Sequence, residues 1–234
     1  MLKRNNKYIP RSLIGRFDLP FIQNRQSKLT IVGLSAGRCG TAYCSKLLTK
    51  NGFNIGHEEI FTPRGPNFSS LLIGDVSWLA VPYIGTLSCQ FFTVSREPSK
   101  VISSFLEIGF FRKDYSSVYK NYAKSYFEFT GHEGEDAVNW YIFHMKKSIM
   151  NSIFHYKTGV TPPDELLDFI EDIVGIPDQN SPRIVDLPVQ NKKENQKKFK
   201  LNDIVFPLKR RSELMELAEL LGYSNENVQR LKWR

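Results

Sequence analysis

The stretch "KLTIVGLSAGRCGTAYCSKLL", residues 28–48, decides the fold of this chain. Residues 29–34 are apolar and rich in β-branched side chains, which is typical of a buried parallel strand. A loop of small residues follows, and residues 41–50 have the pattern of an amphipathic helix that ends at Asn51-Gly52. A turn of this kind exposes free backbone N–H groups and the positive end of a helix dipole. The stretch therefore predicts an anion-binding turn between a strand and a helix.

Apolar runs and helical patterns continue to alternate after this turn. Short strands are predicted within residues 53–59, "FNIGHEE", and at 90–95, "QFFTVS", with a chain turn at Gly74-Asp75 between them. Helices are predicted from about residue 99 and over 163–174. This βαβ…βα order predicts an α/β fold with a mostly parallel central sheet flanked by helices.

Composition limits the class of protein. Of the 234 residues, 41% are hydrophobic and 13% are aromatic, which suits a globular chain and excludes a disordered one. No apolar run approaches the roughly 20 residues that span a bilayer, and nothing resembles a signal peptide. We therefore expect a soluble, cytoplasmic protein without a membrane contact. Three scattered cysteines indicate a reducing compartment, and they have neither the spacing nor the histidines of a zinc site.

The formal net charge of +8 suggests an anionic partner. Most of the excess lies in residues 1–28 and 191–211. A nucleotide, a nucleic acid, a membrane surface and an acidic substrate would all suit this charge, and so would a solvated basic surface. Charge alone does not choose among them.

The loop after the first strand narrows the choice of anion. Gly37 and Gly40 let backbone N–H groups approach a ligand, Arg38 adds a full positive charge, and Thr41 adds a hydroxyl. A nucleoside-triphosphate loop would read G-x-x-x-x-G-K-[ST]. Counted from Gly33, Arg38 stands where that motif needs its last glycine, and the Lys-Ser/Thr pair is absent. These residues favour a different phosphate-containing ligand.

A second turn with similar chemistry follows the strand at residues 90–95. In "SREPSKVISSF", Arg96 stands at the strand end and Pro98 at the entry to a helix, and Ser104 comes eight positions after Arg96. The planar guanidinium offers paired donors to a phosphate, and Ser104 brings a hydroxyl about two helical turns later. Pairing of Arg96 with Glu97 would be the purely structural alternative.

Together the two turns resemble those of sulfotransferases that use 3′-phosphoadenosine-5′-phosphosulfate (PAPS). In that family a loop of the type [Lys/Arg]-x-Gly-[Thr/Ser], here residues 38–41, "RCGT", holds the 5′-phosphosulfate. A later arginine with a serine eight positions beyond it, here Arg96 and Ser104, holds the 3′-phosphate. The resemblance covers about residues 28–150 and implies a phosphate-loop-type sulfotransferase fold with no metal requirement. The nucleotide-binding residues that it implies are Gly37, Arg38, Cys39, Gly40, Thr41, Ala42, Arg96 and Ser104.

The resemblance also implies a catalytic base. In related branches it is a glutamate after the second strand, and "GHEE" occupies that place here. Glu58 is our first candidate, His57 the second and Glu59 the third, because a partly enclosed carboxyl or an imidazole titrates in the useful range. Arg38 and the amides of Gly40 and Thr41 would stabilise the leaving phosphate.

The acceptor side is less well defined. Asp75, Ser77 and Trp78 are candidates for lining it, with Trp78 equally suited to the core. The tyrosines of residues 115–126 recur at helical spacing, which favours a packing face over an acceptor platform. A carbohydrate, a small alcohol, a lipid and a peptide all remain open as acceptors, and so does the oligomeric state.

The resemblance divides the chain within a single domain, 1–234. Residues 1–27 are predicted to be an irregular basic arm, 28–110 the nucleotide-binding core, and 111–234 a mainly helical acceptor-side and C-terminal part. The Arg-Lys-Gly motif with which many relatives close over the nucleotide is absent, and "KKENQKKFK", residues 192–200, is a possible substitute. The alternatives are a phosphate-loop nucleotide kinase, a basic nucleic-acid-binding protein, which we favour less, and a sulfotransferase fold without turnover.

Overall fold

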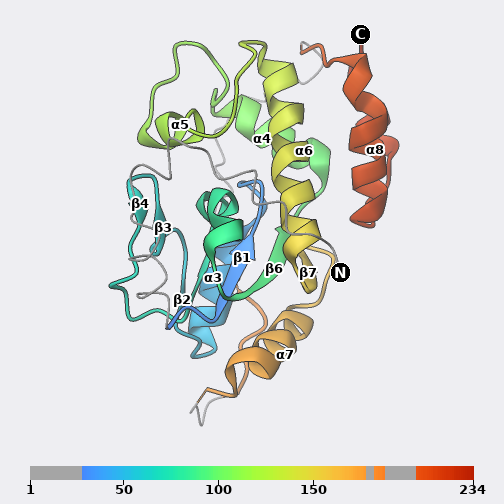
Figure 1. Cartoon of the computed structure of the whole chain (residues 1–234). Helices are drawn as coiled ribbons and strands as arrows, with labels where there is room; N and C mark the ends of the chain where they lie inside the picture. Colours follow the sequence, from blue (N-terminus) through green and yellow to red (C-terminus); the bar gives the residue numbers. More distant parts are fainter. Residues whose placement is uncertain (1–27, 178–181, 188–203) are drawn as a thin grey trace, which may run out of the picture.

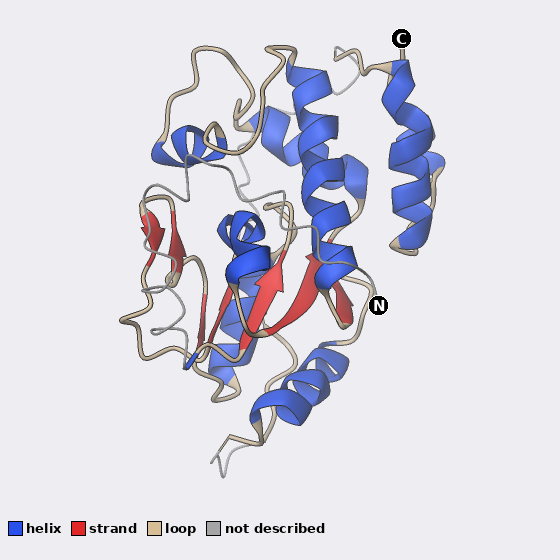
Figure 2. Cartoon of the chain, in the orientation of Figure 1, coloured by secondary structure: helices blue, strands red, loops and turns tan. Residues whose placement is uncertain are grey.

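The computed structural model describes residues 28–177, 182–187 and 204–234 (Figure 1). The predicted basic arm of 1–27 and the lysine-rich segment of 192–200 lie outside these residues. A five-stranded parallel sheet with the order β2-β5-β1-β6-β7 forms the centre of the fold (Figure 2). The prediction of an α/β fold with a parallel central sheet flanked by helices is confirmed. The strands are β1 (Ile31–Leu34), β2 (Ile55–Gly56), β5 (Gly74–Val76), β6 (Gln90–Ser95) and β7 (Phe154–Lys157).

Helices cover the sheet, and a small antiparallel hairpin stands beside it (Figures 1 and 2). The predicted helices at 41–50 and 163–174 are confirmed, and the one expected from about 99 begins at Pro98. No described helix combines the length and the apolar character needed to cross a membrane. The remaining elements are α3 (Thr41–Lys50), β3 (Phe61–Thr62), β4 (Gly65–Pro66), η3 (Trp78–Thr86), α4 (Pro98–Glu107), α5 (Val118–Ala123), α6 (Glu133–Asn151), α7 (Pro163–Val174), η5 (Leu208–Arg210), α8 (Arg211–Leu220) and α9 (Glu226–Gln229).

The turn predicted at Gly74-Asp75 is wrong, because these two residues belong to β5. The strand lies between β1 and β2, with Gly74 opposite both Ile31 and Ile55. A Cβ on Gly74 would stand 2.5 Å from the backbone oxygen of Ile31, so the glycine permits close approach of two strands. The local sequence is a turn signal, but the packing of the sheet overrides it.

Strand β7 was not predicted either. Residues 111–234 were predicted to be mainly helical, but within them α6 ends at Asn151. The chain then pairs Phe154 with Phe92 and Tyr156 with Val94, in parallel with β6. Residues 154–157 thus form an edge strand of the sheet.

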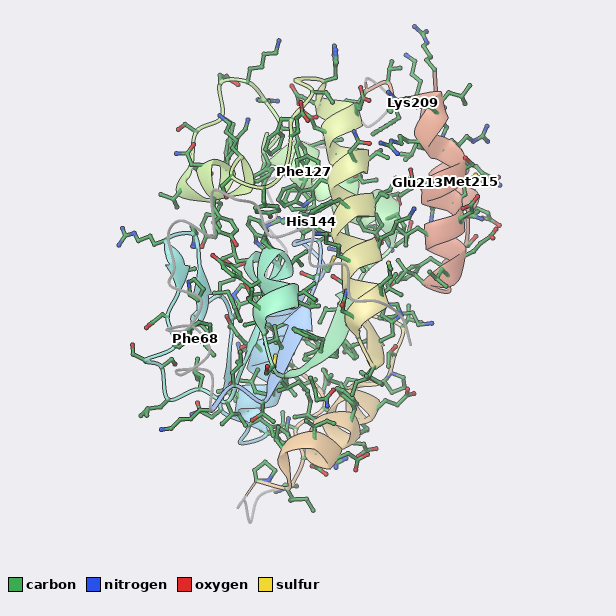
Figure 3. All side chains as sticks on the ribbon, viewed as in Figure 1. Phe68, Phe127, His144, Lys209, Glu213 and Met215 are labelled. Atoms are coloured by element: carbon green, nitrogen blue, oxygen red, sulfur yellow. The ribbon has the colours of Figure 1, made fainter. Side chains whose placement is uncertain are left out.

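The core between α4, α6 and the loop at 110–130 is built around Trp140. This side chain is fully buried and lies against the rings of Phe105, Phe110 and Phe127. His144, also fully buried, is bonded through Nε2 to the Tyr126 hydroxyl at 3.0 Å. Figure 3 places Phe127 and His144 between α5 and α6. The aromatic residues therefore join α6 to the loops above the carboxyl end of the sheet.

Helix α8 and the preceding short helix η5 are attached to α6 by ion pairs. Lys146 Nζ lies 2.6 Å from Glu213 Oε1, and Lys209 Nζ lies 2.9 Å from Glu135 Oε1. Figure 3 shows Glu213 on α8, beside α6. Leu214 and Leu217 are buried below these pairs. The ion pairs lie at the surface, so the apolar residues supply most of the stability of this contact.

Candidate anion-binding site

The two predicted turns leave neighbouring strands at the same edge of the sheet. From β1 the chain passes through α3 to β2 on one side, and from β6 it passes to β7 on the other side. The connections of the adjacent strands β1 and β6 therefore run in opposite directions. Ligands of open α/β sheets bind in the crevice at such a switch point, beyond the carboxyl ends of the strands.

The loop after β1 is held in an unusual backbone conformation. The φ angles are 79° at Gly37, 57° at Arg38 and 93° at Gly40, all in the left-handed region. A Cβ on Gly40 would stand 2.8 Å from the Thr158 side chain, whose hydroxyl donates to the Cys39 carbonyl at 2.6 Å. The glycine is therefore required both by its φ angle and by this close packing.

The first turn of α3 offers unused hydrogen-bond donors. Gly40 caps the helix without a side-chain hydrogen bond, and the helical pattern starts with Cys44 N–H to Gly40 C=O at 3.0 Å. Within the described part of the chain, no group accepts from the amides of Thr41, Ala42 or Tyr43. The side chain of Ala42 is small and exposed. These amides and the helix dipole are suited to an anion. The amide of Gly37 donates instead to Ser35 Oγ at 3.0 Å.

The two turns meet through two pairs of residues. Arg38 Nε donates to Ser104 Oγ at 2.9 Å, which joins the loop after β1 to the middle of α4. Cys39 lies against Arg96, within reach of both its backbone and its charge, and burial raises the pKa of the Cys39 thiol to about 12. Cys39 is therefore a neutral packing group, and only its backbone is available to a ligand.

Neither Arg38 nor Arg96 forms an ion pair with a carboxylate of the described residues. In residues 28–177, 182–187 and 204–234 no carboxylate lies within ion-pair distance of either guanidinium. Glu97, the expected partner of Arg96 in the structural alternative, pairs with Lys100 Nζ at 2.9 Å and accepts from Ser99 Oγ at 2.6 Å. Arg96 itself is half-buried, and its carbonyl accepts from the Tyr141 hydroxyl at 3.1 Å. Both charges remain available to an anion.

The "GHEE" segment lies beside the first turn of α3. His57 Nε2 is 2.9 Å from Thr41 Oγ1, and Glu58 Oε1 is 3.9 Å from the same ring nitrogen. Burial lowers the pKa of His57, against the opposing charge of Glu59, so the imidazole is neutral near pH 7. Glu59 is exposed. The structure brings Glu58 and His57 to the predicted anion loop and leaves Glu59 at the surface.

The environment of Glu58 changes its protonation. Burial raises the pKa of the Glu58 carboxyl above its ordinary value, and the negative charge of Asp75 adds to this effect. Hydrogen bonds from Tyr119 and Trp78 oppose it. Tyr119, which bonds this carboxyl, is itself 38% exposed. A raised pKa is the change that a carboxyl acting as a general base requires.

Sequence reasoning missed several contacts of this site. Thr158 and Tyr141, which hold the two turns, belong to no motif, and their distance along the chain hides the contact. Tyr119 was assigned to a packing face, yet it bonds Glu58. Trp78 is buried against Trp140, as the core interpretation expects, and it also reaches Glu58. The sequence pattern around Tyr119 and Trp78 could not distinguish a packing role from a contact with Glu58.

The backbone of Arg38 gives a direct stability prediction. Replacing Arg38 by alanine or by glycine removes the same exposed side chain and its bond to Ser104. Because φ at this position is 57°, alanine keeps the left-handed strain and glycine relieves it. We expect Arg38→Gly to be more stable than Arg38→Ala by about 1 kcal/mol in urea unfolding. Equal stability of the two variants would contradict the left-handed conformation.

The described residues contain no cluster of three or more histidine, cysteine, aspartate or glutamate side chains that could hold a metal ion. Comparison of the chain with protein-family models, with curated proteins and with solved structures gives no match. The site is therefore interpreted from its own residues and geometry.

Proposed function

We propose that this protein transfers the sulfuryl group of PAPS to a hydroxyl or amine of an acceptor. The observation that carries the proposal is the hydrogen bond from Arg38 Nε to Ser104 Oγ. It joins two motifs that resemble the nucleotide-binding turns of PAPS sulfotransferases, and it does so at the switch point between β1 and β6. Arg38 and Arg96, neither of which forms an ion pair with a described carboxylate, supply the positive charge that such a nucleotide requires, and the amides at the start of α3 supply further donors.

The arrangement suits a ligand with anionic groups at both ends. In the proposal the 5′-phosphosulfate is bound by Arg38 and by the amides of Gly40, Thr41 and Ala42. The 3′-phosphate is bound by Arg96 and Ser104, with the guanidinium giving paired donors. Nucleotides without a 3′-phosphate would lose the second set of contacts. This difference separates PAPS from ATP and AMP.

The proposed reaction is an in-line displacement at sulfur. A bond forms between the acceptor oxygen or nitrogen and sulfur, while the bond from sulfur to the 5′-phosphate oxygen breaks. The electron pair leaves with the phosphate as 3′-phosphoadenosine-5′-phosphate (PAP), where Arg38 and the helix amides stabilise the new charge. The acceptor proton passes to the Glu58 carboxylate. Neutral His57 accepts from or donates to Thr41 and orients the first turn of α3.

Thermal unfolding in the presence of PAP, ATP and AMP tests the proposal. At 100 times its dissociation constant, PAP should stabilise the protein by about 2.7 kcal/mol. Arg96→Ala and Ser104→Ala should remove most of this effect, because each deletes a proposed contact to the 3′-phosphate. Arg230→Ala is the matched control, since Arg230 is exposed near the C-terminus and pairs only with Glu226 among the described residues. It should leave the shift unchanged.

Other outcomes would favour the alternative functions. Equal stabilisation by ATP would favour a nucleotide kinase over a sulfotransferase. A basic nucleic-acid-binding protein would bind RNA or DNA with strong salt dependence, and this affinity would survive Arg38→Ala and Arg96→Ala. PAP binding without any PAPS consumption, over a screen of labelled transfer to acceptors, would indicate a fold that binds the nucleotide but does not turn it over.

A further inference from the structure

Asp75 lies on β5, next to the strand that carries the "GHEE" segment. In the sheet it stands opposite Gly56, the last residue of β2, and its side chain is fully buried. A Cβ on Gly56 would stand 2.6 Å from Leu72 Cδ1 and 3.0 Å from Glu59 Oε1, so the start of this turn is closely packed. The register thus brings the Asp75 carboxylate under the turn that follows β2.

The Asp75 carboxylate accepts hydrogen bonds from the backbone of this turn. Its Oδ2 accepts from the amides of Phe61 at 2.9 Å and Ile60 at 3.1 Å, and its Oδ1 accepts from Glu59 at 3.4 Å. No described lysine or arginine lies within ion-pair distance of Asp75. The buried charge is therefore compensated by backbone donors of one turn, a costly arrangement that fixes the path of that turn.

The residue just before these amides is strained. Glu58 has a φ angle of 57°, in the left-handed region where a side chain is unfavourable. Such conformations persist where the surroundings determine them, and they gather at functional sites. The three amides held by Asp75 follow Glu58 directly along the chain.

We propose that Asp75 is the positioning residue of this site, which holds the turn at 59–61 and thereby presents the Glu58 carboxyl beside His57 and Thr41. The role of Glu58 as a base rests on the proposed sulfuryl transfer, whereas the placement of Glu58 by Asp75 does not.

The charge of Asp75 acts on Glu58 as well. The titratable groups that face Glu58 are His57 on its own turn, Asp75 on β5 and Tyr119 on α5. The titratable group that faces Asp75 from the same turn is Glu59. Burial raises the pKa of Asp75 to about 6, against the hydrogen bonds of the three amides. The negative charge of Asp75 also raises the pKa of Glu58. Removing the charge of Asp75 should therefore lower the pKa of Glu58.

The test combines carboxyl titration with turnover. In NMR spectra, the ¹³C carboxyl resonances of Glu58 and Asp75 are assigned by their loss in Glu58→Gln and Asp75→Asn. The chemical shifts of these resonances are then followed as the pH is changed. Asp75→Asn should lower the pKa of Glu58. In the wild type, the backbone amide resonances of Ile60 and Phe61 should shift with the titration of Asp75, because its carboxylate accepts from both amides. PAPS breakdown to PAP with water as acceptor should fall roughly 10²-fold in Asp75→Asn, and its acid limb should move to lower pH. PAP binding should stay within about twofold, because the nucleotide contacts are untouched.

Asp136→Asn is the matched control. Asp136 is also fully buried and holds backbone amides of a loop, those of Thr130 at 2.7 Å and Gly131 at 3.1 Å. Asp136→Asn should lower the stability of the protein, as Asp75→Asn does. It should leave the titration of Glu58 and the pH profile of PAPS breakdown unchanged. Unchanged Glu58 titration in folded Asp75→Asn would overturn the proposal, and so would amide resonances of Ile60 and Phe61 that do not follow the Asp75 titration. The measurement on the wild type decides the matter if Asp75→Asn does not fold. Failure of wild-type protein to bind PAP would reject the proposed function, while the titrations would still decide the role of Asp75.

Discussion

Glu58→Gln is expected to lower the rate of PAPS consumption by about 10²–10⁴-fold, the usual contribution of a general base. The amide keeps the size of the side chain but cannot accept a proton at working pH. PAP binding should stay within about twofold, because Glu58 takes no part in the proposed nucleotide contacts. Release of PAP from PAPS measures the rate, and the thermal shift with PAP measures binding.

The pH dependence provides a second check on Glu58. A base acts in its ionised form, and burial raises the pKa of this carboxyl. Activity should therefore fall on acidification at a higher pH than an exposed glutamate would cause, and recover as pH rises through the raised pKa. His57→Ala serves as the comparison. If turnover survives Glu58→Gln and disappears in His57→Ala, then the imidazole is the base and our assignment is wrong.

Trp140→Ala is expected to lower the free energy of unfolding by about 3–5 kcal/mol, the range for large aromatic side chains deleted from a core. The side chain is fully buried among the rings of Phe105, Phe110 and Phe127, which leaves little room for collapse around the cavity. Its Nε1 also donates to the Ala36 carbonyl at 2.8 Å, in the loop after β1. Urea unfolding followed by circular dichroism measures the loss.

Trp140→Phe separates packing from the hydrogen bond. Phenylalanine keeps much of the aromatic contact but leaves the buried Ala36 carbonyl without its donor, at a cost of about 1–3 kcal/mol. Because this carbonyl belongs to the loop that carries Arg38, PAP affinity should also fall in Trp140→Phe. A loss of stability below about 0.5 kcal/mol in Trp140→Ala would mean that Trp140 is not packed as described.

Much of the local structure was predictable from the sequence. The strand at 90–95 and the helices at 41–50 and 163–174 agree with their predicted bounds, because apolar periodicity and end signals act over a few residues. The errors came where local signals and packing disagree. Gly74-Asp75 is a turn signal by composition, but the close approach of Ile31 makes it part of β5.

In the candidate site, too, the motifs were predictable from the sequence, whereas the contacts between distant segments were not. Arg38, Arg96 and Ser104 were singled out by the residue types of two short turns and by the resemblance that these turns carry, and the structure brings all three to one edge of the sheet. Thr158 and Tyr119 could not be predicted as neighbours of these turns. Their contacts join segments far apart in the sequence, and no repeat or spacing records such a distance.

The sequence by itself determined the two strand-turn-helix units and the residue types that they carry, since the steric and hydrogen-bonding preferences of such units act between near neighbours. Only the tertiary structure decided that β1 lies beside β6, so that Arg38 meets Ser104, and that Asp75 lies under the turn of Glu58. Strand order is chosen by burial of both faces of the sheet and by the path of long connections. That choice depends on the whole chain, and it decides which charges meet.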